Sequence, residues 1–150
     1  MPTATLFLVP ASLGESRPDA ILPAEVLRIV RGLRYFVVEN AKSARAELKR
    51  IGVEHPLQEI DIRELSREPK QADLDALLAP LVAGESAGLM SEAGAPAVAD
   101  PGALLVRAAH ARGIRVAPLV GPSSLLLALM ASGLNGQSFA FHGYLPVREP

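Results

Sequence analysis

The sequence predicts one α/β domain with a mainly parallel, five-stranded sheet flanked by helices, and three observations lead to this fold class. Short apolar runs alternate with longer segments whose apolar residues recur at helical spacing. The first of these runs, at residues 5–9, is typical of a strand buried on both faces of a parallel sheet. No internal repeat or change of composition divides the 150 residues, so a single domain is expected.

The first four elements follow this alternation. Residues 5–9 form an apolar strand, and residues 11–18 have the composition of a loop. Residues 23–30 are predicted to be a helix because they begin with proline and carry valine and leucine on one face. Residues 35–38 are a second apolar strand.

A helix over residues 41–50 comes next, and Asn40 is placed to cap it. Alternatively, Glu39 and Asn40 project from the end of the second strand and orient a substrate hydroxyl or a cofactor amine. The helix has basic residues three and four positions apart, which fits either a phosphate-contacting face or a solvated one. These residues are Lys42, Arg45 and Lys49.

The second half of the chain begins less regularly. Residues 55–69 keep no single period and are expected to form a surface connector that contains a short strand. Beyond them the alternation returns. The helices are predicted over 71–82, 103–112 and 125–131, and the strands over 87–90, 115–119 and 138–142.

The loop over residues 91–102 is the first candidate for a binding site. It is rich in glycine and proline, and Asp100 followed by Pro101 indicates the start of a helix. In an open parallel sheet, ligands bind where such loops leave the carboxyl ends of the strands. The alternative is an elaborate connector with a well-made helix cap.

A second candidate is the turn before the last predicted helix. Gly121 and Pro122 are followed by Ser123 and Ser124, which are placed to cap the helix. The unpaired amides of a helix start also hold carboxylates and other anions. A cap and a ligand site can share these amides.

Composition narrows the classes of function. The formal net charge of −1 gives no overall attraction to nucleic acid, although a local basic patch is compatible with it. No apolar run approaches the roughly 20 residues that a membrane span needs. A cytoplasmic location is expected because cysteine and a secretion signal are absent. No metal is expected, since the histidines are dispersed at His55, His110 and His142.

Six motifs in a fixed order resemble those of the tetrapyrrole methylase superfamily, and within it the branch that methylates small-subunit ribosomal RNA. The motifs are VPASLG at 9–14, SEAGAP at 91–96, DPG at 100–102, GIRV at 113–116, GPSS at 121–124 and GYLP at 143–146. The resemblance implies a methyltransferase that uses S-adenosyl-L-methionine (SAM), bound in a cleft between two α/β domains and usually in a homodimer. Residues 1–143 would be the N-terminal domain of this class III methyltransferase architecture, and residues 144–150 the start of a linker to a second domain.

The resemblance also implies roles for individual residues. Most contacts to SAM would come from backbone or apolar groups. The residues expected to make them are Pro10, Leu13, Gly94, Ala95, Pro96, Val98, Gly121, Ser123 and Ser124. Glu92 is the candidate general base and Glu39 the next, with a supporting role for Glu92 as an alternative.

Three polar positions depart from the pattern of this branch. Glu92 replaces an aspartate, Ala95 replaces a threonine, and the sequence ENAK at 39–42 replaces an acidic residue followed by Asp-Thr-Arg. The leading hypothesis is methylation of a ribose in small-subunit ribosomal RNA, or a paralogous activity. The alternatives are methylation of a tetrapyrrole or other small molecule, and a degenerate, non-catalytic interaction module.

Overall fold

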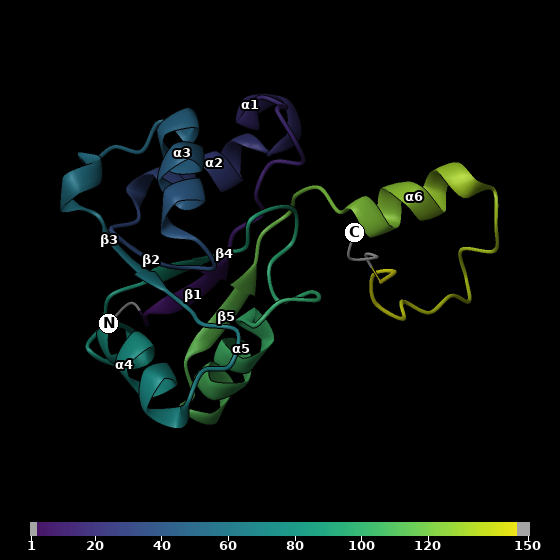
Figure 1. Ribbon diagram of the computed structural model, residues 1–150. Coiled ribbons are helices and arrows are strands. Elements are labelled where there is room, and N and C mark those ends of the chain that lie inside the picture. Colours follow the sequence, from purple (N-terminus) through teal and green to yellow (C-terminus); the bar gives the residue numbers. More distant parts are fainter. Residues whose placement is uncertain (1–2, 147–150) are drawn as a thin grey trace.

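The computed structural model describes residues 3–146 and forms an α/β fold around a five-stranded, all-parallel sheet, which confirms the predicted fold class. Residues 147–150 of the predicted linker lie outside the described residues. The strand order across the sheet is β3-β2-β4-β1-β5 (Figure 1). The strands are β1 (Thr5–Leu8), β2 (Tyr35–Val38), β3 (Asp61–Glu64), β4 (Ala87–Met90) and β5 (Arg115–Pro118).

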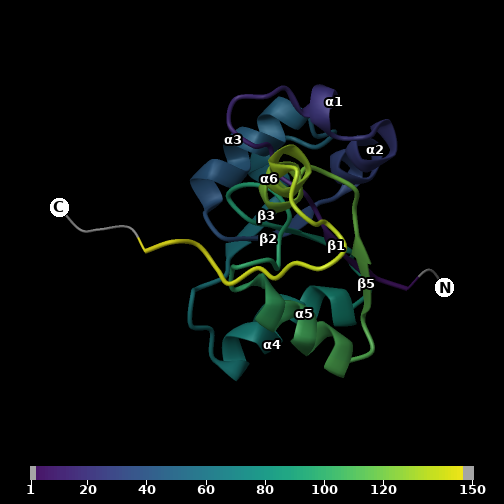
Figure 2. The ribbon, with the colours of Figure 1, turned by 90° about the vertical axis from the view of Figure 1, so that its right-hand side faces the viewer.

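Helices cover both faces of the sheet. Figure 1 shows α1, α2 and α3 on one face and α4 and α5 on the other, while α6 projects away from the sheet. Figure 2 shows the same two layers from the side. The helices are α1 (Pro18–Ile21), α2 (Ala24–Gly32), α3 (Ala41–Ile51), α4 (Gln71–Val82), α5 (Gly102–Ala111) and α6 (Ser124–Ser132), with a short 3₁₀ helix, η1, at Leu57–Glu59.

Strands β2 and β4 are apolar and buried at every position because helices cover both of their faces. Along β2, Tyr35 and Val37 pack into the core beneath α4 and α5, whereas Phe36 and Val38 pack beneath α2 and α3. Gly88 allows β4 to lie close to β2, since a Cβ there would sit 2.7 Å from the Phe36 ring. The two cores hold the carboxyl ends of β1, β2 and β4 at one edge of the sheet.

The prediction of the fifth strand was wrong in its location. Residues 138–142 form no strand, and Phe139 and Phe141 are 58% and 42% exposed. A strand needs a partner for its backbone groups, and nothing in the described chain pairs with this segment. The sheet is completed instead by β3, which pairs with β2 along its whole length. This strand lies within residues 55–69, the connector that was expected to contain a short strand.

Two smaller differences concern helices. Pro18–Ile21 form the short helix α1, which was not predicted; Pro18 was expected at the end of a loop. Helix α6 is strongly apolar, yet none of its residues is buried. Among the described residues, no helix is long and apolar enough to cross a membrane.

Candidate functional site

The loop after β4 is tied to the loop after β1 by a pair of backbone hydrogen bonds. The amide of Ala11 donates to the carbonyl of Gly94 at 2.9 Å, and the amide of Gly94 donates to the carbonyl of Ala11 at 3.1 Å. Both segments leave the carboxyl edge of the sheet, because β1 and β4 are neighbouring parallel strands. The geometry therefore brings the two sequence-predicted loops together where parallel sheets bind ligands.

Gly94 is placed where a side chain would disturb this contact. Its φ is +67°, a left-handed conformation that other residues adopt only at a cost. A Cβ on Gly94 would lie 3.3 Å from Cδ2 of Leu13 and 3.7 Å from the carbonyl oxygen of Pro122. Three loops thus converge on this one glycine.

The remainder of the loop is strained and is held by Asp100. Ala97 and Ala99 both have positive φ, at 66° and 59°, and such strain persists only where the surroundings impose it. The Asp100 carboxylate accepts hydrogen bonds from the amides of Ala97 at 3.0 Å and Gly102 at 2.8 Å. Burial raises the pKa of Asp100 above its usual value, while these two amides act in the opposite direction. The N-cap residue of α5 is Pro101, and not Asp100 as the sequence predicted, but Asp100 binds the first amide of the helix and shapes the loop.

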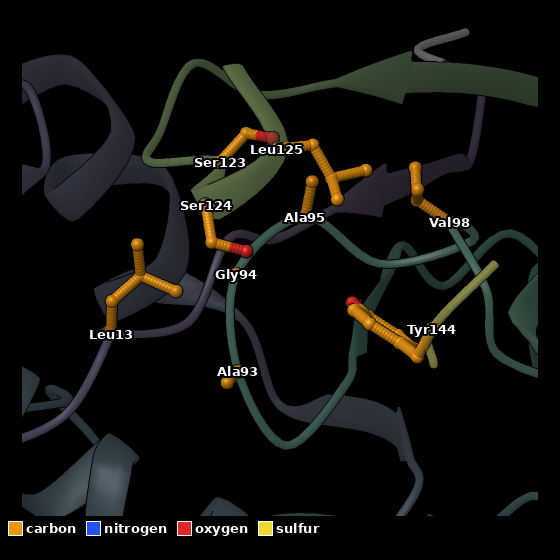
Figure 3. A pocket seen from close by; sticks show the side chains of 9 residues that line it. All are labelled: Leu13, Ala93, Gly94, Ala95, Val98, Ser123, Ser124, Leu125 and Tyr144. Carbon is orange, nitrogen blue, oxygen red and sulfur yellow. The ribbon is translucent and has the colours of Figure 1, made fainter. Parts of the chain in front are cut away.

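A small pocket of about 80 Å³ lies between these loops and the start of α6 (Figure 3). It is lined by residues from four separate segments of the chain. Six of them were predicted as SAM contacts: Leu13, Gly94, Ala95, Val98, Ser123 and Ser124. Ala93, Leu125 and Tyr144 complete the lining. Tyr144 comes from the segment that returns past α6, and its place could not be predicted from local sequence.

The pocket opens into a wider apolar groove of about 870 Å³ along α6. The two share part of their lining, including Ala95, Val98 and Ser123. Ligand sites for molecules of cofactor size usually occupy about 300–1,000 Å³, so the small pocket alone is too small and the combined depression is large enough. Gly121 lines the groove only, and a Cβ on it would lie 2.2 Å from Cβ of Pro10.

The start of α6 differs from the predicted cap. Ser123 occupies the N-cap position, but its side chain makes no capping hydrogen bond. Both Ser123 and Ser124 instead line the small pocket. The first amides of a helix have no acceptor within the helix, so this helix start faces the pocket without a side chain to satisfy it.

Two of the predicted SAM contacts, Pro10 and Pro96, lie outside the small pocket and the groove. Pro10 is buried beneath Gly121 and supports the turn. Pro96 is buried and lines a separate small cavity with Glu39, Leu89 and Asp100. The structure therefore places both behind the surface that the other predicted residues form.

Glu92 lies in a different depression from the predicted SAM contacts. This depression of about 320 Å³ is lined by Glu39, Asn40, Glu64, Leu65, Ser66, Arg67 and Glu92. The amide of Glu92 donates to Oε2 of Glu39 at 3.2 Å, and Oε1 of Glu92 accepts from the hydroxyl of Ser43 at 3.3 Å. Glu39 and Glu92 are thus brought together at the ends of β2 and β4. The loop after β4, which contains Glu92, also contributes to the lining of the small pocket.

Asn40 behaves as the predicted cap. Its side-chain oxygen accepts a hydrogen bond from the amide of Ser43 at 2.9 Å and another from the Ser43 hydroxyl at 3.2 Å. The amide of Ala41 donates to Glu64 at 2.9 Å. The first turn of α3 is therefore satisfied by side chains from β2 and β3, which explains the position of Asn40 without a ligand.

One functional residue that sequence analysis missed is Glu47. It is only 9% exposed, and its Oε1 accepts hydrogen bonds from both the amide and the hydroxyl of Ser12. Its other oxygen pairs with Arg50 at 3.2 Å. A signal was present in the sequence, because Glu47 falls in helical phase with the buried Ala44 and Ile51. A carboxylate on the buried face of a helix needs hydrogen-bond or ion-pair partners, because burying an unpaired charge is costly.

Within residues 3–146, no group of three or more histidine, cysteine, aspartate or glutamate side chains is arranged to hold a metal ion. The lining of the small pocket is instead apolar, hydroxyl and backbone in character. The arrangement suits an organic ligand with an apolar body and a few polar groups.

Comparison with known proteins gives a consistent group of relatives, although no family model matches the chain. The chain is 38% identical over 137 residues to "Ribosomal RNA small subunit methyltransferase I" of Xylella fastidiosa (strain Temecula1), covering 91% of this chain and 46% of that protein. Proteins of the same name from Pseudomonas aeruginosa and Escherichia coli O157:H7 are 34% and 32% identical over 99% and 96% of the chain. These alignments cover 50% and 48% of the two relatives.

The chain thus spans about half the length of the curated relatives that it matches. The matched names agree with the resemblance seen in the six sequence motifs. The chain is therefore homologous, over most of its length, to proteins named ribosomal RNA small subunit methyltransferase I.

Proposed function

We propose that the chain supplies the cofactor-binding half of a SAM-dependent methyltransferase that acts on small-subunit ribosomal RNA. The observation that carries this proposal is the convergence of Leu13, Gly94, Val98 and Ser123 on one pocket, which opens into a groove of sufficient volume. The names of the relatives supply the reaction and the substrate class. Ribosomal RNA also makes the cytoplasm the proposed place of action.

The residues present fit the chemical groups of SAM. Leu13 and Val98 offer apolar contacts to an adenine ring or ribose carbon atoms, and the glycine and alanine of the loop allow backbone groups to approach. The amides at the start of α6 suit the carboxylate of the methionine part. When bound, SAM supplies an activated sulfonium methyl group, so the protein's main task is to align the reacting atoms and exclude water.

We propose Glu92 as the group that takes a proton from an attacking hydroxyl. Its carboxylate is exposed and accepts one hydrogen bond, from Ser43, which leaves acceptor positions for a substrate. Glu39 lies beside it and binds its amide, so Glu39 is suited to position Glu92. A Glu92→Gln variant should keep SAM affinity and lose methyl transfer, and unchanged transfer would remove Glu92 from this role.

We also propose that residues 1–143 form the N-terminal domain of a two-domain protein that works as a homodimer. The supporting observation is the apolar surface of α6, where Leu127 is 50% and Met130 is 76% exposed on the part that does not line the groove. Apolar patches of this kind usually mark an interface. Sedimentation of a Leu127→Glu, Met130→Glu variant should show a smaller assembly than the wild type, and an identical mass would contradict the proposal.

The proposal is tested by titrating S-adenosylhomocysteine into this chain and into the full-length gene product by calorimetry. Binding by both establishes the site, and binding by the full-length product alone shows that further residues complete it. No heat from either protein, at several temperatures, would favour the non-catalytic module. Salt dependence of substrate binding separates RNA from a small neutral molecule, since only RNA binding releases many counterions.

A further inference from the structure

Helix α3 has an outer face on which every charged residue is a cation. The exposed side chains along it include Lys42, Arg45, Lys49 and Arg50. The only acid in the helix is Glu47, which is buried and already bound to Ser12 and Arg50. The net charge of the whole chain is −1, so this face is a local concentration of positive charge and does not reflect a basic protein.

Three of these cations have no partner within the described part of the chain. Lys42, Arg45 and Lys49 take part in none of its ion pairs or side-chain hydrogen bonds. Arg50 differs, because it is held by Glu47 and by the carbonyl groups of Glu15 and Ser16. The unpaired cations are therefore free to bind an external anion, while Arg50 mainly secures the neighbouring loop.

The spacing of the three residues makes a row. They lie three and four positions apart, on one side of the helix. At 1.5 Å per residue, the row from Lys42 to Lys49 is about 10 Å long. A row of this length suits a run of neighbouring negative charges rather than a single small ion.

A second basic depression, a groove of about 340 Å³, includes Arg50 at the end of α3. This groove is lined by Arg17, Pro18, Asp19, Arg31 and Arg50. Asp19 lies 3.5 Å from Arg17 and offsets part of its charge. Arg31 uses its Nε atom to bind the carbonyl of Ile51, which leaves the rest of its guanidinium group exposed to the groove. The basic surface thus extends from α3 to the loop after β1.

The other end of the row lies beside the candidate acids. Ser43, next to Lys42, donates its hydroxyl to Glu92, and the amide of Ala41 donates to Glu64. Carboxylates repel phosphate at this end, whereas the cations attract it along the helix. The charge pattern favours a ligand with its anionic backbone on α3 and an uncharged group at Glu92.

We propose that the outer face of α3 binds the phosphate backbone of the RNA substrate and guides one nucleoside toward the depression at Glu92. We define the α3 row as Lys42, Arg45 and Lys49. This inference rests on the proposed function for its substrate class, and it adds the surface that the substrate contacts. The contacts are to phosphates, so they contribute affinity and orientation without reading the base sequence.

The test compares two variants of the full-length gene product that lose the same charge. The first is Lys42→Gln, Arg45→Gln, Lys49→Gln. The matched control is Lys70→Gln, Arg107→Gln, Arg115→Gln, whose three exposed cations belong to the α4, α5 and β5 side of the molecule. Circular dichroism checks that both fold, and calorimetry checks that both bind S-adenosylhomocysteine as the wild type does.

The measured quantity is affinity for a transcript of small-subunit ribosomal RNA at several salt concentrations. The α3 row variant should bind about tenfold or more weakly than the wild type at moderate salt, and its slope of log affinity against log salt should be shallower by about two to three. The control should stay close to the wild type. Equal losses in both variants would show a general charge effect and overturn the inference.

Other outcomes separate this inference from the proposed function. Normal cofactor binding with no effect of the α3 row on RNA affinity overturns the inference and leaves the methyltransferase assignment intact. RNA binding that depends on the α3 row without any cofactor binding supports the inference and contradicts the assignment. If the wild-type protein binds no RNA but binds anionic vesicles through the α3 row, RNA is the wrong ligand and the row binds a lipid surface instead.

Discussion

Ser12 donates two hydrogen bonds to one carboxylate oxygen of Glu47, from its hydroxyl at 2.6 Å and from its amide at 3.1 Å. This contact joins α3 to the loop after β1. The next residue back, Ala11, is paired with Gly94 in the loop after β4. A buried carboxylate on a helix thus anchors both loops of the small pocket, although it does not touch the pocket itself.

Replacing Glu47 should therefore affect both stability and the pocket. Glu47→Ala leaves the buried Ser12 hydroxyl and amide without an acceptor and should cost roughly 2–4 kcal/mol of unfolding free energy. Glu47→Gln keeps a side-chain oxygen for Ser12 and should cost less. Denaturant unfolding measures the loss, and amide exchange at Gly94 should quicken in the alanine variant. Unchanged exchange at Gly94 would show that the anchor does not reach the second loop.

Gly94 should be sensitive to any side chain for two separable reasons. Gly94→Val should destabilise the fold by at least about 1–2 kcal/mol through its positive φ, and should weaken binding of S-adenosylhomocysteine at least tenfold through the contact with Leu13. Gly113→Val is the matched control, because Gly113 has φ of +68° and nothing within 4 Å of a Cβ. Calorimetry should show normal binding by this control, and equal weakening in both would contradict the site.

Asp100 should tolerate loss of its charge better than loss of its oxygen atoms. Asp100→Asn keeps an acceptor for Gly102 and Ala97, so its unfolding free energy at neutral pH should stay near that of the wild type. Asp100→Ala should lose about 1–2 kcal/mol, as for a removed helix cap. Denaturant midpoints give both values. Equal losses in the two variants would mean that the carboxylate charge, and not the acceptor, holds the loop.

The pH dependence of these variants follows from the raised pKa of Asp100. The folded state favours the protonated carboxyl, so this stabilisation is full below the ordinary pKa of 3.8 and is lost as the pH rises through the raised pKa. Asparagine does not titrate. Wild type should therefore gain stability relative to Asp100→Asn as the pH is lowered through this range.

Tyr35 offers a test on the opposite face of the sheet. Its buried hydroxyl donates to the carbonyl of Leu77 at 2.6 Å, and burial raises its pKa to about 12, against a smaller lowering by Arg63. Tyr35→Phe should lose about 1–2 kcal/mol at neutral pH without changing cofactor affinity. The tyrosine contribution is full below pH 10 and is lost as the pH rises through 12, so the two stability curves should converge in that range. Denaturant midpoints measured between pH 7 and 12 check this, and parallel curves would contradict it.

Much of the fold could be predicted because its signals are local. Strands β2 and β4 are apolar at every position since two layers of helices bury both of their faces. Helix boundaries followed from residues with local effects, as with Asn40, whose side chain caps α3. The strand over 138–142 could not be rejected in the same way, because an apolar run does not reveal whether a partner strand is present.

The candidate site could also be predicted only in part, where its signals are local. Glycine and proline residues in the sequence marked the loops over 91–102 and 121–124, and the motifs they form were enough to indicate the family. The sequence by itself determined which segments turn at the carboxyl edge of the sheet, because backbone conformation depends on residue type and near neighbours.

Only the tertiary structure decided which of these residues face one another. It placed Glu92 beside Glu39 and away from the small pocket, brought Tyr144 into the pocket, and joined Ser12 to Glu47. Among the described residues, it also left Lys42, Arg45 and Lys49 of α3 without an ion-pair partner. Ser12 and Glu47 are 35 residues apart in the chain, and Glu39 and Glu92 are 53 apart. Strand order and helix packing bring such residues together, and local residue spacing does not.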